Sequence, residues 1–235
     1  MSENIKKTTK AFRVDLDSSK NQIMLKPIAR YSFNNQTHQV SEATEKIHEL
    51  IKNASYSNDD IVLKRNEIKE AFFSPFKPQL KNAQVFLSHL HADKNKALEV
   101  KDYLENQTKR KVFIDSLFWD YKDGVLNELA KHDDISRIKD AFTLILRESL
   151  QDMIEKCPYF VFLQSKNSVS NQGLSRITYS EWIYEELKIA HSISAISESR
   201  PILIMESMQV FHDISLFLKS FETITLNELS QQINS

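Results

Sequence analysis

QVFLSHLHADKNKALEVKDYLENQTKRKVFIDS, at residues 84–116, is the stretch that decides the fold. It starts with the short apolar run QVFLSH and closes with a second one, KVFIDS. The polar segment between them places Ala97, Val100 and Leu104 on one face of a helix. Two strands joined by a helix indicate parallel pairing, because a parallel connection needs a crossover of about this length.

The same alternation of strands and helices continues toward the C-terminus. Three further apolar runs predict strands: YFVFLQ at 159–164, RPILIME at 200–206, and ETITL at 222–226 as an edge strand. Helical patterns separate them, in RIKDAFTLILRESLQDMIEK at 137–156, at residues 180–191 and in HDISLFLKSF at 212–221. A polar loop is predicted at 165–176, before the second of these helices. The sequence therefore predicts an α/β fold with a five-stranded parallel sheet flanked by helices.

Residues 1–80 differ in texture and are predicted to form a small α+β extension before the main domain at 81–235. They are polar and end in FFSPFKPQ, where Pro75 and Pro78 mark a boundary. The runs AFRVDL and QIMLKPIARY flank DSSKN and predict a hairpin, and SEATEKIHELIKNA and DDIVLKRNEIKEAFF predict helices. Every candidate ligand contact lies after Gln84. We therefore expect the extension to regulate or assemble the main domain.

Composition excludes several classes of protein. The chain has 235 residues, a net charge of −1 and one cysteine, Cys157, so a disulfide framework and a cysteine metal site are excluded. Its two glycines, Gly124 and Gly173, cannot build a Gly-rich phosphate loop. The balanced charge indicates neither a nucleic-acid nor a membrane partner, and neither a signal peptide nor a membrane-spanning run is expected. A reducing cytoplasm is the expected compartment.

The helix SEWIYEELKIAH at 180–191 carries one acid in an unusual place. At about 100° per residue, Ile183, Glu186, Leu187 and Ala190 fall within the same apolar arc as Trp182. Burying an unpaired carboxylate costs several kcal/mol. Glu186 is therefore a candidate functional residue.

Polar and aromatic residues follow the predicted strands where their carboxyl ends meet, which is where parallel α/β sheets bind ligands. The candidates at this edge, besides Glu186, are Ser88, His89, Asp115, Ser116, Trp119 and Trp182. Two tryptophans with hydroxyls and an acid suit a flat heterocycle attached to a sugar. Because SHLH lacks further ligands, we expect no metal site.

Each candidate also has a structural interpretation. Ser88 and His89 could cap the following helix, and Asp115 could cap a helix or form a salt bridge. The two tryptophans have alternatives of the same kind: a protein-contact residue for Trp119 and a core residue for Trp182. Glu186 could pair with Arg147 or with His89.

Several strings resemble those of a known family, the TIR (Toll/interleukin-1 receptor) domain. VFLSHLHADKNKALEVKDYLE with KVFIDSLFWDY resembles the opening of such a domain, and MIEKCPYFVFLQSKNSVS resembles its later half. SEWIYEEL is similar to the family's Ser-x-Trp-x-x-x-Glu-Leu signature, matched by Ser180, Trp182, Glu186 and Leu187. The resemblance spans residues 84–226. It is strongest to standalone bacterial TIR proteins, including those of Thoeris-type antiphage defence.

The resemblance implies a flavodoxin-like fold and an enzymatic activity. Catalytic TIR domains cleave NAD at the nicotinamide–ribose bond, and the signature glutamate, here Glu186, is their catalytic residue. NAD is then the substrate, and no cofactor is needed. After KVFIDS, the segment LFWDYKDG is predicted to be a loop that exposes Trp119 and Tyr121. This loop, at 116–123, matches the family loop that gates the pocket and mediates assembly. Leu90 departs from the family pattern, as does a polar insertion at 131–140.

The resemblance also implies partners. TIR domains self-associate, and a nucleotide product, ADP-ribose or a cyclic isomer, could diffuse to a downstream effector. The alternative function is a non-catalytic TIR adaptor that works through TIR–TIR contacts. A two-component receiver is disfavoured, because Ser88 and His89 stand where a receiver needs an acidic pair for magnesium.

Overall fold

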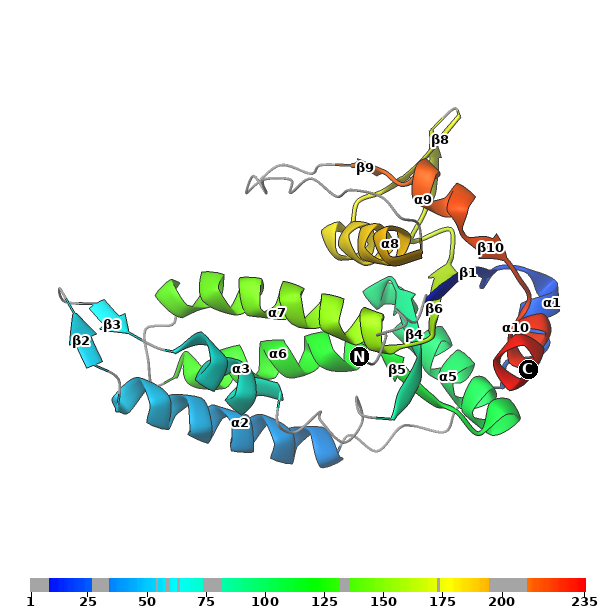
Figure 1. Cartoon of the computed structure of the whole chain (residues 1–235). Coiled ribbons are helices and arrows are strands. Elements are labelled where there is room, and N and C mark those ends of the chain that lie inside the picture. Colours follow the sequence, from blue (N-terminus) through cyan, green and yellow to red (C-terminus); the bar gives the residue numbers. More distant parts are fainter. Residues whose placement is uncertain are drawn as a thin grey trace, which may run out of the picture. The chain divides into compact units, whose positions relative to one another are not determined.

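The computed structural model describes residues 9–26, 34–53, 55–57, 60–62, 64–73, 82–131, 136–172, 174–194 and 211–235. The described chain forms two compact units (Figure 1). One consists of Met1–Ile28, Ala83–Asp115 and Gln151–Ser235, and the other of Ala29–Asn82 and Ser116–Leu150. These units do not divide at residue 80, where the sequence predicted a domain boundary. Pro75 and Pro78 lie outside the described residues.

The first unit is built on a five-stranded parallel sheet with strand order β10-β1-β6-β4-β5. The strands are β1 (Lys10–Asp15), β4 (Ala83–His89), β5 (Lys111–Ile114), β6 (Tyr159–Gln164) and β10 (Glu222–Thr223). An α/β fold with a five-stranded parallel sheet is therefore confirmed, with β10 at its predicted edge. The predicted strand at 200–206 lies outside the described residues.

The helices of this unit cover the sheet. They are α1 (Ser19–Gln22), α5 (Lys94–Thr108), α8 (Glu181–Ser194), α9 (Ser215–Ser220) and α10 (Leu226–Asn234), with the short 3₁₀ turn η2 (His91–Asp93). Helix α8 packs against β1 and β4, whereas α5 contacts β4 and β5 and packs on α10. Figure 1 shows α8 on one side of the sheet and the α5–α10 pair on the other.

The hairpin predicted at the N-terminus is wrong. Strand β1 pairs in parallel with β6 over its whole length and with β10 on its other side, so it lies inside the sheet. Phe12 and Val14 are buried, and Ser18 leads into α1 instead of a reverse turn. The alternating pattern of AFRVDL fits a hairpin strand and a sheet strand equally well, and only distant partners decide between them.

A second, antiparallel sheet takes two of its strands from the segment predicted as a polar loop after β6 and its third from residues 212–213. Its strands are β7 (Ser170–Gln172), β8 (Ser175–Thr178) and β9 (His212–Asp213), in the order β7-β8-β9. The loop prediction for 165–176 is thus wrong in part. The turn after β6, at residues 165–169, remains irregular and carries short hydrogen-bonded turns.

The second unit is mainly helical. It contains α2 (Asn34–Lys52), the hairpin strands β2 (Ser55–Ser57) and β3 (Asp60–Val62), α3 (Arg65–Phe73), α6 (Asp115–Leu129) and most of α7 (Ser136–Lys156). Phe72 makes edge-to-face contacts with Tyr121 and Phe142, and the Tyr121 hydroxyl donates to the Phe72 carbonyl at 2.8 Å. This aromatic cluster is the core of the unit.

The loop predicted at 116–123 is a helix. Helix α6 begins at Asp115, and Tyr121, expected to be exposed, is fully buried. A Cβ on Gly124 would stand 3.1 Å from Val40, so the glycine permits the close approach of α2. Aromatic and acidic residues in LFWDYKDG indicated a loop, but packing against Phe72 and Val40 favours the helix. Burial raises the pKa of the Tyr121 phenol.

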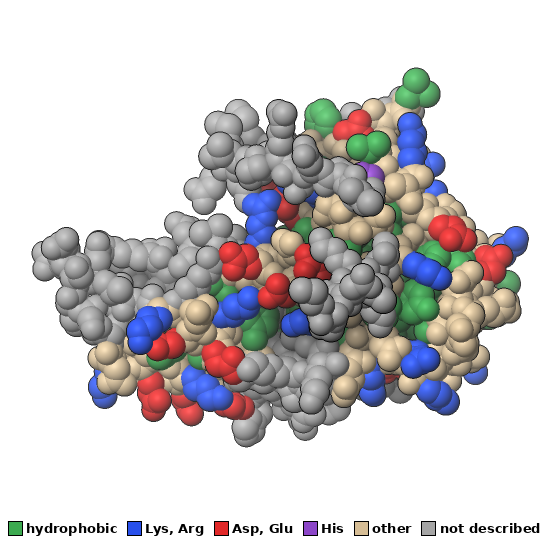
Figure 2. All heavy atoms as spheres, in the orientation of Figure 1, with side chains coloured by type: hydrophobic (Ala, Val, Ile, Leu, Met, Phe, Trp, Pro, Cys, Tyr) green, Lys and Arg blue, Asp and Glu red, His purple; other side chains and the backbone are tan. Residues whose placement is uncertain are grey.

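No helix among the described residues is long and apolar enough to cross a bilayer. Figure 2 shows acidic and basic side chains interspersed on one face of the molecule. Cys157 is a buried free thiol, and burial raises its pKa to about 12.

Candidate functional site

Helix α8 places Glu186 on its buried face. The helix begins at Glu181, where the Ser180 hydroxyl accepts a hydrogen bond from the Ile183 amide at 3.3 Å. Its buried residues are Ile183, Glu186, Leu187 and Ala190. The helix phase predicted from the sequence is therefore confirmed, with an acid among apolar neighbours.

The Glu186 carboxyl is hydrogen-bonded to Ser88, near the carboxyl end of β4. The residue is 0% exposed, and its Oε2 accepts a hydrogen bond of 2.5 Å from the Ser88 hydroxyl, which is itself fully buried on β4. The other oxygen, Oε1, has no hydrogen-bond donor among the described residues. Ser88 is thus engaged with α8 and does not cap the helix that follows β4, where Leu90 is the N-cap residue of η2.

Two more ionisable residues complete this cluster. His89 ends β4, Asp115 directly follows β5, and each is 3% exposed. Strands β4 and β5 pair in register at Leu87 and Ile114. Because the two strands are neighbours, His89 Nε2 lies 3.5 Å from Asp115 Oδ1. The salt-bridge interpretation of Asp115 agrees with this contact.

The electrostatics of the cluster favour a neutral Glu186. Burial raises the pKa of the Glu186 carboxyl well above its usual range, and the nearby Asp115 carboxyl raises it further. The hydrogen bond from Ser88 acts in the opposite direction. Asp115 also lies within hydrogen-bond reach of the Glu186 carboxyl. Asp115 therefore opposes ionisation of Glu186, because two neighbouring negative charges repel each other.

The remaining predicted residues stand as follows. Trp182 lies on α8 one turn before Glu186 and is half-buried. Ser116 is buried in the first turn of α6. The backbone of Trp119 belongs to α6, and its side chain lies outside the described residues. The structure therefore brings together Ser88, His89, Asp115 and Glu186.

Sequence reasoning missed a second polar cluster at the carboxyl ends of the strands. Asp93, just after β4, accepts hydrogen bonds from Ser165 Oγ at 2.5 Å and from Asn167 Nδ2 at 3.0 Å. Asp17, just after β1, accepts from the Lys166 amide at 2.8 Å, which lowers its pKa. The signal for Asp17 was its position after an apolar run, which the hairpin prediction obscured.

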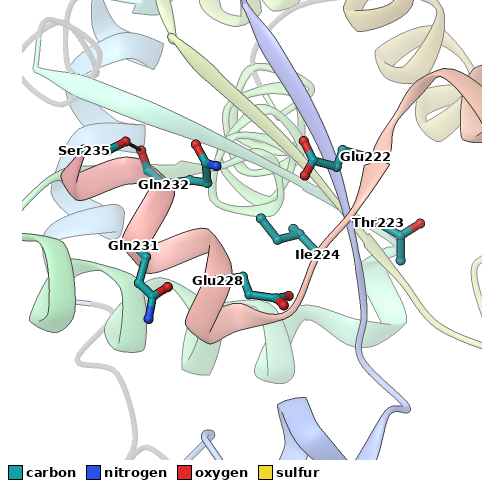
Figure 3. A pocket seen from close by; sticks show the side chains of 7 residues that line it. All are labelled: Glu222, Thr223, Ile224, Glu228, Gln231, Gln232 and Ser235. Carbon is teal, nitrogen blue, oxygen red and sulfur yellow. Dashed lines mark hydrogen bonds between the residues drawn. The ribbon is translucent and has the colours of Figure 1, made fainter.

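A pocket lies elsewhere on the same unit. It has a volume of about 440 Å³ and is formed between β10 and α10 (Figure 3). Its lining residues are Glu222, Thr223, Ile224, Glu228, Gln231, Gln232 and Ser235. Glu228 is already used in the capping box of α10 with Thr225. None of the lining residues belongs to the Glu186 cluster.

Within the described part of the chain, no three His, Cys, Asp or Glu side chains gather in a way that could hold a metal ion. The cluster itself offers two carboxyls, an imidazole and a hydroxyl. A carboxyl in this setting can stabilise a developing positive charge more strongly than in water.

Comparisons with known proteins returned no match, whether against family models, curated proteins or solved structures.

Proposed function

We propose that this chain is a TIR-type enzyme that cleaves the nicotinamide–ribose bond of NAD, with Glu186 as its catalytic residue. The proposal rests on one observation above all, the fully buried Glu186 carboxyl held by Ser88 at the carboxyl end of β4. Ligands of parallel α/β sheets bind at this edge. The flavodoxin-like topology of TIR domains is part of the same proposal.

Cleavage of the nicotinamide–ribose bond requires few catalytic groups from the protein beyond one carboxylate. Nicotinamide leaves NAD as a neutral molecule, so its departure needs no general acid. The transition state resembles an oxocarbenium ion, whose positive charge an adjacent carboxylate stabilises. Apolar surroundings strengthen that interaction. Glu186 would supply the carboxylate, with NAD as the substrate and without a cofactor.

The neighbouring residues would bind the dinucleotide. Trp182, one turn from Glu186, can stack on the nicotinamide ring. Ser88 fixes the orientation of the Glu186 carboxyl. The other binding residues in this proposal that belong to the same unit are His89 and Asp115. Because Glu186 is fully buried, the side chains that cover it would have to move when NAD enters.

The cellular role that we propose is bacterial antiphage defence in the cytoplasm. The ribosyl cation would be captured by water to give ADP-ribose, or intramolecularly to give a cyclic signal for an effector protein. TIR-type self-association is part of the proposal.

Replacing Glu186 by glutamine tests this function. The amide can still accept the Ser88 hydrogen bond, but it carries no charge, so Glu186→Gln should reduce nicotinamide release from NAD at least about 10²–10³-fold. The measurement is chromatographic detection of nicotinamide with purified protein, together with a thermal melt to establish that the variant is folded.

Glu181→Gln is the matched control, because Glu181 lies on the same helix but is exposed. It should release nicotinamide at the wild-type rate. The assignment of Glu186 is wrong if Glu186→Gln retains the wild-type rate, or if both variants lose activity equally while remaining folded.

A non-catalytic TIR adaptor is the second candidate. The complete burial of Glu186 favours it, because a buried acid with a hydroxyl partner can be a structural element. An adaptor would release no nicotinamide as the wild-type protein, and Glu186→Gln would change its stability alone. The same two measurements therefore separate the candidates.

A further inference from the structure

We propose that Asp115 is a positioning residue that shares one proton with Glu186, keeping Glu186 neutral in the closed site and accepting its proton when a cationic substrate enters. This inference rests on the proposed function for its catalytic consequence, while the shared proton itself can be tested without any activity.

The geometry places the two acids together, away from water. Asp115 follows β5, Ser88 and His89 end the neighbouring β4, and α8 presents Glu186 to the same strand ends. Asp115 and Glu186 are 3% and 0% exposed, so neither carboxyl faces bulk water. The Asp115 carboxyl is therefore the neighbouring group of the protein that can take a proton from Glu186.

The two oxygens of Glu186 have different surroundings. Oε2 accepts from Ser88, whereas Oε1 has no donor among the described residues. Oε1 is thus the oxygen that can carry a proton and donate it in a hydrogen bond to the Asp115 carboxylate. His89 also lies next to Asp115, with Nε2 3.5 Å from Oδ1.

The proton transfer is balanced within the pair. In the closed site the O–H bond is on Glu186 and the negative charge is on Asp115. When the nicotinamide cation enters, the Glu186 O–H bond breaks, an O–H bond forms on Asp115, and the charge moves to Glu186. The net charge of the pair stays at −1 throughout. Release of the neutral product reverses the transfer.

Other charged groups near α8 do not account for this behaviour. The ionisable residues on the elements that pack against α8 are His89 on β4, Lys10, Arg13 and Asp15 on β1, Arg176 on β8, and Lys219 on α9. None of them is among the described groups that shift the Glu186 carboxyl, which are Asp115 and Ser88. On α8 itself, Glu185 and Lys188 are paired with each other at 3.8 Å.

The first test is a titration of the full-length protein by NMR, with ¹³C labels on the Glu and Asp side-chain carboxyls. Two carboxyls that share a proton titrate as a pair, so the Glu186 and Asp115 signals should both respond at the same pH steps. Independent titration of the two signals would overturn the proposal, and this readout needs no variant.

The second test replaces Asp115 by asparagine. An amide cannot accept the proton and carries no charge to oppose ionisation, so the Glu186 signal should titrate at lower pH than in the wild-type protein. The acid limb of the pH profile of nicotinamide release should move in the same direction. Asp102→Asn, at an exposed position on α5, is the control and should move neither.

The outcomes separate the two proposals. If the Glu186 titration moves but no nicotinamide is released at any pH by the wild-type protein, the carboxyl pair is correct and the proposed function is wrong. If nicotinamide is released and Asp115→Asn moves neither the titration nor the acid limb, the role of Asp115 is wrong and the proposed function stands.

Discussion

Two buried carboxyl groups at the same edge of the sheet have opposite surroundings. Asp93 accepts a hydrogen bond on each oxygen, from Ser165 and from Asn167, and is 4% exposed. Glu186 is 0% exposed and accepts one, from Ser88, while its Oε1 has no donor among the described residues. Both oxygens of Asp93 are hydrogen-bonded, so we call this carboxyl saturated, whereas Glu186 has one oxygen without a donor.

This difference separates a structural acid from a candidate functional one. A buried carboxylate that is hydrogen-bonded on both oxygens ties the segment after β6 to the segment after β4, and it contributes to stability. A buried acid that lacks a donor on one oxygen and faces a second carboxyl opposes folding in its charged form. Such a group is retained where its charge has a use, which is the reason to place chemistry at Glu186.

The largest expected effect on stability comes from removing β1, a strand of the parallel sheet at whose edge Asp93 and Glu186 lie. Deleting residues 1–26 removes β1, which pairs with both β6 and β10, so the truncated chain should not fold. Circular dichroism should then record no cooperative thermal transition. A truncated protein that still melts cooperatively would show that β1 is dispensable for the sheet.

A point variant within β1 tests the same idea at constant chain length. Val14 is fully buried, so Val14→Asp should also abolish the cooperative transition by burying an unpaired charge. Lys10→Asp, at the exposed start of the strand, is the control and should melt as the wild-type protein does.

The sheet and the Glu186 phase could be predicted from the sequence because each depends on local periodicity. QVFLSH, KVFIDS and YFVFLQ each contain an unbroken apolar run of three or more residues, as strands buried on both faces should. The spacing of Ile183, Leu187 and Ala190 fixed the buried side of α8 and placed Glu186 on it. Neither inference required knowledge of distant partners.

The position of β1 and the pairing of acids could not be predicted, because both depend on contacts between distant segments. Nothing in AFRVDL distinguishes pairing with β6 from pairing with QIMLKPIARY. Likewise, Asp115 and Glu186 meet only after β5 and α8 have packed at the same edge. The sequence identified Asp115 and Glu186 as separate candidates and did not indicate that they contact each other.

The next expected effect is on stability at the saturated carboxyl. Asp93→Ala removes the acceptor for Ser165 Oγ and Asn167 Nδ2 and leaves these donors without their partner. Ser165 is buried, whereas Asn167 is exposed and its amide can bond to water instead. An unsatisfied buried donor costs about 1–3 kcal/mol, so the free energy of unfolding should fall by about that amount in urea denaturation.

Asp102→Ala provides the comparison for that measurement, since the exposed Asp102 on α5 should tolerate the change within about 0.5 kcal/mol. If Asp93→Ala were equally harmless, the Asp93 hydrogen bonds would contribute nothing net, and saturation would not distinguish the two acids.

The smallest expected effect on the free energy of unfolding is that of Glu186→Gln, and its pH dependence has a definite sign. The pKa of this carboxyl is raised on folding above its ordinary value of 4.5, first by burial and then by Asp115. Its contribution to stability is therefore complete below pH 4.5 and is lost as the pH rises through the raised pKa. Glutamine does not titrate, and its amide can accept from Ser88 while donating to Asp115.

Glu186→Gln should therefore have a free energy of unfolding close to that of the wild-type protein below pH 4.5 and a larger one at higher pH. Urea denaturation of both proteins at a series of pH values measures this difference, with Glu181→Gln as the control that should show no such trend. A difference that stayed constant with pH would mean that Glu186 titrates alike in the folded and unfolded chains. Asp93 and Glu186 would then differ only in the number of hydrogen bonds that they accept. The missing donor at Glu186 Oε1 would no longer indicate a functional carboxyl.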